Sequence, residues 1–355
     1  MLAEAMTSAA PTARLSIDLT ALTHNYTALK SRAGTAEVAP VVKADAYGLG
    51  MNAIAPWLAH QGARTFFVAR LAEGVALRKL AGPDPVIYVL DGLSEPTSFA
   101  DHRLRPVLNT PQQYQLWLAS PTDIVAALHI DTGMNRLGVR PEDIAGLPDS
   151  GSHRLALVMS HLACGDEPGH PLNHQQLIAF QSAAQRYPNT LKSLANTAGA
   201  YLGPDYAFDL VRPGIGLYGG GPFGVPHTDI RSVAHLTARI LQVHQVKAGE
   251  SVGYGATYAA PRDMALATLG LGYADGLLRS FSTGFVTVKG ERRPITGRIS
   301  MDLLTCDVTG LDVTTGDWVE ILGDAQNLDE VATAAGTIGY ELLTRLGPRI
   351  VRQYT

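Results

Sequence analysis

Eight short apolar runs, each followed by a longer segment of mixed polarity, recur along the first two thirds of the chain. They cover residues 38–42, 65–69, 86–90, 105–108, 124–130, 155–161, 191–195 and 209–218. Several runs are continuously apolar, which is typical of parallel strands that are buried on both faces. Eight strands that alternate with helices over about 200 residues predict a (β/α)8 TIM barrel. A doubly wound open sheet is the alternative, disfavoured because no G-x-G-x-x-G turn follows the first run.

Beyond about residue 230 the pattern changes to strand-like segments separated by glycine, proline and aspartate. These segments are 238–246, 285–288, 303–308 and 318–322. They predict a mainly β domain. We therefore expect a flexible tail at 1–13, the barrel over 14–229 and the C-terminal β domain over 230–355. An alternating stretch near 14–20 also suits a strand, and this first strand would join the β domain.

The composition excludes several classes of protein. With 46% hydrophobic and 17% charged residues the chain can bury a large core. A net charge of −4 gives no basic surface, which argues against a nucleic-acid partner. No stretch approaches the roughly 20 apolar residues of a membrane span. Only Cys164 and Cys306 are present, so we expect no disulfide framework, no metal site and a cytoplasmic location.

Polar residues collect where the predicted strands end, which is where TIM-barrel enzymes carry their active sites. Lys43 follows the first run directly, Arg136 follows the fifth and His161 ends the sixth; Asn196 and Thr197 follow the seventh, and Arg212 and Gly214 lie in the eighth. This gathering at one end of several strands indicates a functional site.

Lys43 has two interpretations. Its ammonium group could simply reach solvent from the end of a buried strand. It could instead form a Schiff base, with a pKa lowered by burial and by neighbouring cations. Tyr47 and the nearby glycines would let a phosphorylated cofactor approach the backbone, and Thr197, Gly214 and Ile215 follow strands whose loops often bind phosphate. These features favour pyridoxal phosphate over an aldolase-type lysine without a cofactor.

Arg212 could form a surface ion pair or could face the pyridine nitrogen of such a cofactor. A cation at that position keeps the nitrogen unprotonated, because a second positive charge would be costly. The ring is then a weaker electron sink, which favours rapid reprotonation of a carbanion over transamination.

Nine motifs, in order from Lys43 to Tyr340, resemble those of alanine racemases, which are fold-type III pyridoxal-phosphate enzymes. They are VVKADAYGLG, DTGMNRLG, SHLACGDE, ANTA, VRPGIGLYG, VGYGATY, GYADG, GRISMD and IGYE. Each motif alone is weak, but nine in order are very specific. The resemblance implies a barrel that binds the cofactor, and an enzyme that interconverts L- and D-alanine and supplies D-alanine for cell-wall peptidoglycan.

The resemblance also implies roles for individual residues. Lys43 would hold pyridoxal 5′-phosphate covalently, and Arg212, held by His161, would face its pyridine nitrogen. The residues expected round the rest of the cofactor are Tyr47, Arg136, Asn196, Thr197, Gly214, Ile215 and Tyr340. Arg136 and the backbone N–H of Met301 would bind the substrate carboxylate. The residues expected at the entrance are Asp166, Tyr273, Arg279 and Arg298.

Tyr254 would be the second catalytic base. Racemisation needs proton donors on both faces of a planar carbanion, and Lys43 and Tyr254 would supply one each. In this family the tyrosine comes from the other subunit, so the resemblance implies a head-to-tail homodimer. A strand tyrosine with a half-buried ring is the structural alternative.

Two positions depart from the family pattern. Many members have a lysine that becomes carbamylated where this chain has His129, and histidine cannot form that carbamate. We therefore expect a bound anion such as chloride, or a nearby carboxylate, to offset Arg136; the alternative is a tolerated histidine in the barrel interior. Ser193 likewise stands where some members have a histidine beside the pyridine-facing arginine.

Other functions remain open. A broad-specificity or serine racemase would share the fold and differ only in pocket volume. A basic amino-acid decarboxylase is disfavoured, because it usually presents an acidic group to the pyridine nitrogen. A non-catalytic cofactor-binding protein is disfavoured by Tyr254 and the motifs of the C-terminal domain.

Overall fold

The computed structural model describes residues 11–150 and 154–355, so the first ten residues of the predicted tail at 1–13 lie outside the described part. The chain divides into two compact units. The barrel unit consists of Thr23–Leu217 and Gly221–Phe223, and the sheet unit of the residues up to Leu22, Tyr218–Gly220 and Gly224–Thr355. Strand β1 begins at Ala13, inside the predicted tail. The domain boundaries predicted from the sequence, 14–229 and 230–355, stay a prediction.

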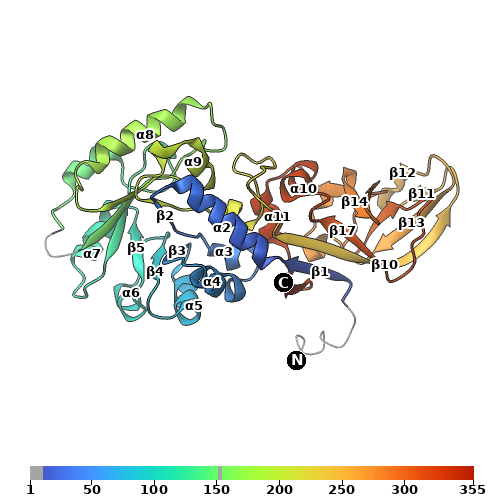
Figure 1. The fold of residues 1–355 in the computed structure, drawn as a ribbon, viewed down its shortest axis with the longest axis horizontal. Coiled ribbons are helices and arrows are strands. Elements are labelled where there is room, and N and C mark those ends of the chain that lie inside the picture. Colours follow the sequence, from blue (N-terminus) through green and yellow to red (C-terminus); the bar gives the residue numbers. More distant parts are fainter. Residues whose placement is uncertain (1–10, 151–153) are drawn as a thin grey trace. The chain divides into compact units, whose positions relative to one another are not determined.

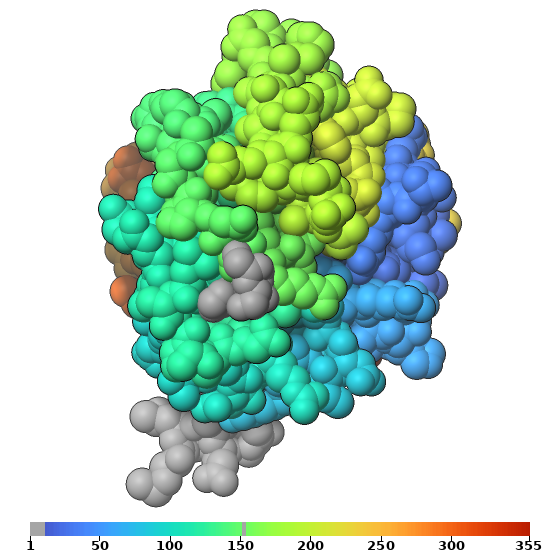
Figure 2. Space-filling model, turned by 90° about the vertical axis from the view of Figure 1, so that its left-hand side faces the viewer, coloured from blue at the N-terminus to red at the C-terminus, as the bar shows by residue number. Residues whose placement is uncertain are grey.

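Parallel strands form a closed ring in the barrel unit, which confirms the predicted fold class. The strands are β2 (Glu37–Val38), β3 (Thr65–Val68), β4 (Val86–Val89), β5 (Arg105–Leu108), β6 (Ala126–His129), β7 (Leu155–Met159), β8 (Leu191–Ser193) and β9 (Leu210–Val211). β3 to β8 pair in sequence order and β2 pairs with β9. Single bridges, Val41 with Phe67 and Asn196 with Arg212, close the ring on both sides. In Figure 2 the colours accordingly follow the sequence round the face of this unit.

Two barrel strands are shorter than their apolar runs predicted. The run at 38–42 supplies β2 and the Val41 bridge, because Pro40 between them has no N–H to donate to a ladder. The run at 209–218 supplies β9. The Pro213 carbonyl still accepts the Val41 N–H at 2.9 Å, but Pro213 has no N–H to continue the ladder, and Ile215–Tyr218 then form a 3-10 turn. In both cases the chain leaves the strand just where polar site residues follow.

Helices separate the strands in the order that the sequence predicted (Figure 1). They are α2 (Leu19–Ala33), α3 (Lys43–Tyr47), α4 (Met51–His60), α5 (Leu71–Ala81), α6 (Pro96–Asp101), α7 (Pro111–Leu118), α8 (Pro171–Ala184) and α9 (Thr197–Leu202). The Thr110 hydroxyl accepts the Gln113 N–H at 3.1 Å and so caps α7. None of the helices in residues 11–150 and 154–355 is long and apolar enough to cross a membrane.

The sheet unit is built round β10, a long strand whose first half alternates between buried and half-buried residues. Its strands are β1 (Ala13–Ile17), β10 (Ala234–Val246), β11 (Ser251–Val252), β12 (Tyr258–Ala259), β13 (Met264–Leu269), β14 (Phe285–Val288), β15 (Glu291–Pro294), β16 (Leu304–Asp307), β17 (Trp318–Leu322) and β18 (Val351–Tyr354), with helices α10 (Leu328–Ala334) and α11 (Gly339–Arg345). A register shift between Ile240 and Gln242 divides β10. One half pairs with β1 and β17, and the other with β13.

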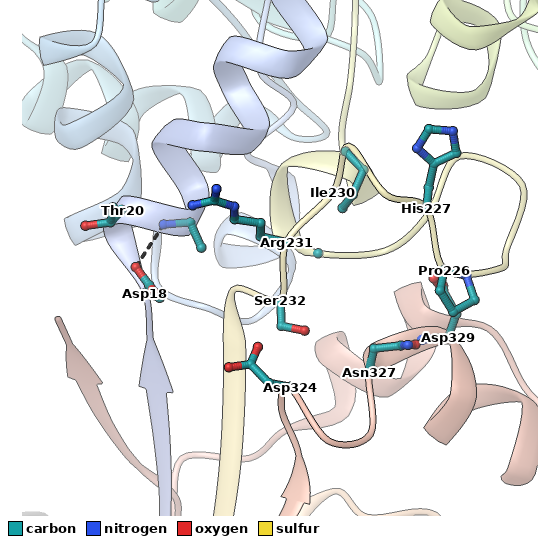
Figure 3. Close-up of a pocket in the computed structure, with 12 residues that line it drawn as sticks. Asp18, Thr20, Pro226, His227, Ile230, Arg231, Ser232, Asp324, Asn327 and Asp329 are labelled. Carbon is teal, nitrogen blue, oxygen red and sulfur yellow. Dashed lines mark hydrogen bonds between the residues drawn. The ribbon is translucent and has the colours of Figure 1, made fainter.

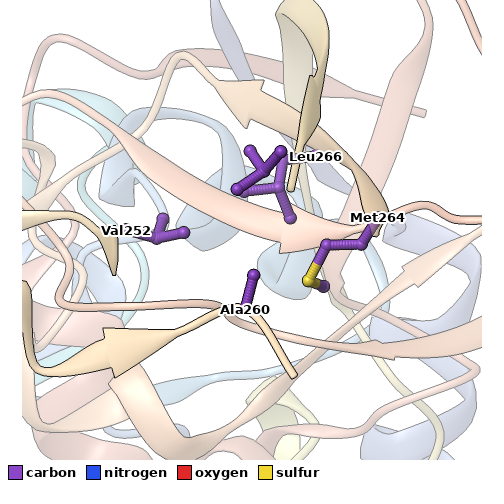
Figure 4. Packing of buried hydrophobic residues seen from close by; sticks show 5 residues of the cluster. Val252, Ala260, Met264 and Leu266 are labelled. Atoms are coloured by element: carbon purple, nitrogen blue, oxygen red, sulfur yellow. The ribbon is translucent and has the colours of Figure 1, made fainter. Parts of the chain in front are cut away.

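A small apolar cluster fixes the β11–β12 hairpin to this sheet. It consists of Val246, Val252, Ala260, Met264 and Leu266, with Tyr258 packed against it (Figure 4). The connection between β11 and β12 carries Tyr254 in a 3-10 turn. Val252 and Tyr258 thus anchor the two strands of the hairpin, while the turn between them presents Tyr254.

Candidate active site

Lys43 begins a left-handed turn at the end of the first barrel segment. The Val42 N–H donates to the Phe67 carbonyl at 2.9 Å, which ties the chain to β3 just before Lys43. The four residues that follow have positive φ: 50° at Ala44, 55° at Asp45, 53° at Ala46 and 58° at Tyr47. This conformation costs an L-residue roughly 1–2 kcal/mol. Contacts from elsewhere in the barrel unit must therefore stabilise the turn.

Two carboxylates and the turn's own backbone provide such contacts. Glu73 Oε1 accepts the Ala44 N–H at 2.8 Å. Asp45 Oδ1 accepts the Met51 N–H at 2.7 Å, at the start of α4. The Gly48 N–H donates to the Ala44 carbonyl at 2.7 Å and closes the turn.

The electrostatic surroundings favour a reactive amine on Lys43. Burial lowers the pKa of Lys43 and the charge of Arg136 lowers it further, against smaller opposing effects of Glu73 and Asp91. A larger share of neutral amine at neutral pH is what a lysine needs to attack a carbonyl. Arg136 itself is exposed.

Three residues predicted round a phosphate meet in the barrel unit. The Thr197 hydroxyl accepts the Gly214 N–H at 3.1 Å and the Gly216 N–H at 3.2 Å. A Cβ atom at Gly214 would lie 2.1 Å from the Tyr47 hydroxyl, so only glycine admits Tyr47 there. The Tyr47 and Thr197 hydroxyls are donors of the kind that a phosphate monoester accepts, and both lie at this end of the barrel. The residues present therefore fit the phosphate of pyridoxal phosphate.

The other predicted phosphate residues of the barrel unit lie in the same segments. Ile215 directly follows Gly214 and is buried. Asn196 Oδ1 accepts the Gly199 N–H at 2.9 Å and caps α9, the short helix that begins at Thr197. Asn196 therefore supports the position of Thr197.

Arg212 is 4% exposed and donates to groups at the ends of two neighbouring strands. Its Nη1 donates to the Ser193 hydroxyl, and its Nη2 donates to the Ser160 carbonyl at 2.5 Å. The Ser193 hydroxyl in turn donates to the Leu210 carbonyl at 2.5 Å. Burial lowers the pKa of Arg212 to about 9, so the guanidinium still carries its charge at neutral pH. Ser193 thus supplies an acceptor for the Arg212 guanidinium.

His161 lies beside Arg212 as a neutral ring. Its Nδ1 is 3.3 Å from Arg212 Nη2. Burial and then the charge of Arg212 hold the pKa of His161 well below its usual range. Because the guanidinium can only donate, Nδ1 accepts and the ring proton lies on Nε2.

His129 is also a neutral ring, and its tautomer follows from Asn109. The Asn109 amide nitrogen donates to the Leu90 carbonyl at 2.8 Å, which leaves Oδ1 at 2.8 Å from His129 Nδ1. Nδ1 therefore carries the proton and Nε2 is an acceptor. Burial and the charges of Arg212 and Arg136 lower the pKa of His129 to about 4. His129 thus brings no charge to offset Arg136.

Two polar residues that the sequence analysis did not select support these loops. Gln176, which is fully buried, accepts the Ala163 N–H at 2.8 Å and donates to the His161 carbonyl at 2.9 Å and the Thr132 hydroxyl at 3.2 Å. A polar residue on the apolar face of the α8 pattern was the available signal. For Glu73 the signal was an acidic residue in the first turn of a helix that follows a barrel strand.

In the sheet unit, two loops hold predicted residues side by side. The Tyr273 N–H donates to the Ser300 carbonyl at 3.1 Å and the Ala274 N–H to the Met301 carbonyl at 2.9 Å. Within the described residues no acceptor receives the Met301 N–H. The neighbouring Asp302 forms an ion pair with Arg349 at 2.8 Å.

The remaining predicted residues are placed as follows. Tyr254 is 71% exposed, and the glycine after it lies close to the guanidinium of Arg298. Arg279 begins a short 3-10 helix, and Tyr340 lies in α11 with 40% of its surface exposed. Asp166, in the barrel unit, is exposed after β7. The assembly of the predicted residues of both units into one site stays a prediction.

A cavity of about 360 Å³ in the sheet unit involves none of these residues (Figure 3). Its polar lining includes Asp18, His227, Arg231, Asp324 and Asp329. Because no predicted site residue lines it, we assign this cavity no part in the candidate site.

One lining residue, Asp18, explains why the predicted strand near 14–20 ends early. Its Oδ1 accepts the Ala21 N–H at 2.8 Å and so caps α2.

Comparisons with known proteins agree with this arrangement. The family model for the alanine racemase N-terminal domain matches residues 17–222, and that for the alanine racemase C-terminal domain matches residues 233–354. An alanine racemase of Jannaschia sp. (strain CCS1) is 46% identical over 97% of this chain and 99% of its own, and that of Rhizobium meliloti (strain 1021) is 44% identical over 96% of each. The crystal structure of alanine racemase from Bartonella henselae with covalently bound pyridoxal phosphate matches with a TM-score of 0.93 and 37% identity, over 98% of this chain and 100% of that one.

Proposed function

The chain belongs to the alanine racemase family, and from this we propose that it interconverts L- and D-alanine with pyridoxal 5′-phosphate attached to Lys43. The observation that carries the proposal is the barrel-unit site itself. There a lysine with a lowered pKa shares one end of the barrel with a phosphate-type donor set and a buried arginine. Supply of D-alanine for peptidoglycan is the role we propose for this activity.

When bound, the cofactor withdraws electrons from the α-carbon of the amino acid and so makes its proton acidic. Tyr47, Thr197, Gly214 and Ile215, together with Tyr340, would hold the phosphate. The charged guanidinium of Arg212 would face the pyridine nitrogen and keep it unprotonated. That arrangement favours return of the proton over transamination.

Two proton carriers would act on opposite faces of the substrate. The Lys43 amine would take or return the proton on one face, and the Tyr254 hydroxyl on the other. We propose that Tyr254 comes from the partner subunit of a head-to-tail homodimer. Its exposed place on a hairpin whose strands are anchored by Val252 and Tyr258 supports this, because such a side chain is available to a second chain.

The substrate carboxylate would bind to Arg136 and to the Met301 N–H. Both groups are suited to it, since Arg136 is exposed and the Met301 N–H has no acceptor within the described residues. Asp166, Tyr273, Arg279 and Arg298 would line the entrance.

We further propose that a bound anion such as chloride offsets the charge of Arg136. The support is that His129 is neutral and donates its only ring proton to Asn109. Crystals of the enzyme grown with bromide in place of chloride are expected to show an anomalous-scattering peak beside Arg136. An ordered Arg136 held by neutral groups alone would rule the anion out.

A cytoplasmic location completes the proposal, and it is supported by the two cysteines, which are both free thiols in the structure. Fractionation of cells with an antibody against the protein would test it.

The activity is tested by incubating the purified enzyme and pyridoxal phosphate with L-alanine in heavy water. Loss of optical rotation with α-deuteration is the expected result, and Tyr254→Phe should lose most of the racemisation from L-alanine. Alanine that stays optically pure would overturn the substrate assignment. Serine, lysine and arginine would then be tested, to identify a racemase or decarboxylase of another substrate.

A further inference from the structure

We propose that Glu73 is a positioning residue, whose carboxylate holds the left-handed turn after Lys43 and thereby fixes the direction of the Lys43 amine. The inference rests on the proposed function for its reaction. Its geometry, however, belongs to the barrel unit alone, so the two can fail separately.

The Glu73 carboxylate joins two segments that are distant in the sequence. Its Oε1 accepts the Ala44 N–H at 2.8 Å, directly after Lys43. Its Oε2 accepts the Ala69 N–H at 2.7 Å and the Arg70 N–H at 3.0 Å, directly after β3. A carboxylate that only capped α5 would need no contact besides the Arg70 N–H. Because Glu73 also uses its other oxygen, on the Ala44 N–H, we infer that it holds the turn as well as capping the helix.

The Glu73 contact ties the start of the turn to a distant segment, whereas the other hydrogen bonds of Ala44 and Asp45 are local, to the N–H groups of Gly48, Gly50 and Met51. The side chains of Ala44 and Asp45 are exposed, so apolar packing does not fix them. Both have positive φ without being glycine, and such residues persist only where the surroundings determine them. Without the Glu73 contact the backbone after Lys43 would relax toward negative φ angles. The Cα–Cβ bond of Lys43 would then point in another direction, and the amine would be displaced.

Substitutions at Glu73 can separate reach from charge. Glu73→Asp keeps the charge and can still cap α5, but it is one methylene too short to reach both segments. Glu73→Gln keeps the length and removes the charge, which acts on Lys43 against Arg136. We expect both variants to loosen the turn, and Asp more than Gln.

Glu330 offers a matched control. It occupies the same position in the first turn of α10, and its Oε2 accepts the Asn327 N–H at 3.0 Å. Among the described residues it joins no second segment. Glu330→Asp therefore reports what a shortened helix cap does by itself.

The contact can be observed directly in the holoenzyme by NMR. Lysine labelled with ¹³C at the carbonyl and alanine labelled with ¹⁵N select the only two Lys–Ala peptide bonds, 43–44 and 247–248. The Ala248 N–H donates to Asp263 Oδ1 at 2.9 Å and serves as an internal reference. In Glu73→Asp we expect the chemical shift of the Ala44 amide proton to move upfield, because its hydrogen bond is lost, while that of Ala248 stays the same. Glu330→Asp should change neither chemical shift.

The functional readout is the division between kcat and KM. A misdirected amine should lower kcat roughly 10- to 100-fold with little change in the KM for L-alanine. The share of Lys43 that carries cofactor, measured by mass after borohydride reduction, should also fall. Glu330→Asp should keep both values. Should Glu73→Asp fail to fold, Glu73→Gln gives the same readouts.

An unmoved Ala44 amide proton, or a kcat no lower than that of Glu330→Asp, would overturn the proposal. If the wild-type protein does not racemise alanine, the proposed function fails. The Ala44 signal and the labelling of Lys43 would still decide the part played by Glu73.

Discussion

The hydroxyl of Tyr47 lies where a side chain at residue 214 would begin, 2.1 Å from the position of a Cβ atom at Gly214. Tyr47 ends the left-handed turn that starts at Lys43, and Gly214 lies in the segment after the last barrel strand, β9. This contact therefore joins the first and last segments of the barrel. It makes the lysine turn and the phosphate cradle dependent on each other.

Gly214→Ala should displace Tyr47 and weaken binding of pyridoxal phosphate at least tenfold, because the added methyl group and the hydroxyl cannot share one space. Equilibrium dialysis of the cofactor measures this. Gly146→Ala is the control, since nothing lies within 4 Å of a Cβ atom there. Equal affinities in the two variants would contradict the cradle.

Ser193→Ala should lower the free energy of unfolding by about 1–3 kcal/mol, because it leaves buried groups of Arg212 and Leu210 without their partner. Urea unfolding of the enzyme measures the loss. Ser98→Ala removes an exposed hydroxyl that bonds to Glu95, and should change stability by less than about 0.5 kcal/mol. Similar losses in both variants would show that Ser193 does not support Arg212.

The free energy of unfolding should fall as the pH is lowered from about 6.5 to about 4, partly because of His129. Its pKa is about 4 in the fold and about 6.5 when unfolded, so the unfolded chain binds more protons across this window. The contribution of His129 is complete above pH 6.5 and amounts to about 3 kcal/mol. His129→Asn should flatten the slope, as measured by urea unfolding at several pH values. An unchanged slope in His129→Asn would contradict this assignment.

Gln176→Glu should destabilise the fold by about 3–5 kcal/mol at pH 7, because a buried charge replaces the amide that donates to His161 and Thr132. Burial raises the pKa of such a carboxyl, so the defect should shrink as the pH falls. Thermal unfolding over a pH series checks this. Gln175→Glu, exposed on the same helix, should be nearly neutral.

The sequence predicted the barrel well because its strands depend on burial, which continuous apolar runs report. The run at 105–108 coincides with β5, and those at 65–69 and 86–90 differ from β3 and β4 by one residue. The predicted strands were too long where one proline interrupts the ladder of hydrogen bonds within an apolar run, as Pro40 and Pro213 do. The stretch near 14–20 was expected to join the β domain, but its individual partners, β10 and β18, lay beyond what a local pattern reports.

In the site, the sequence identified residues whose chemistry is unusual for their place, such as Lys43 and Arg212. It did not identify Glu73 or Gln176, because each looks ordinary locally and acts on backbone groups far along the chain. The left-handed turn at Ala44–Tyr47 was equally invisible, since no glycine in it marks a positive φ. Conformation there is set by tertiary contacts, which a single sequence does not list.

The pairing of β1 with β18 places Arg14 beside Val351. During synthesis on the ribosome, the segment that forms β1 is therefore made early and its neighbour last. The barrel strands, in contrast, are all complete by Val211, and most pair with the next strand made. We expect the barrel to fold during translation, while β1 stays unpaired on its β18 side until β18 has been synthesised. A chain stalled before residue 350 should accordingly protect the amides of β3 to β8 from hydrogen exchange and leave the outer edge of β1 open.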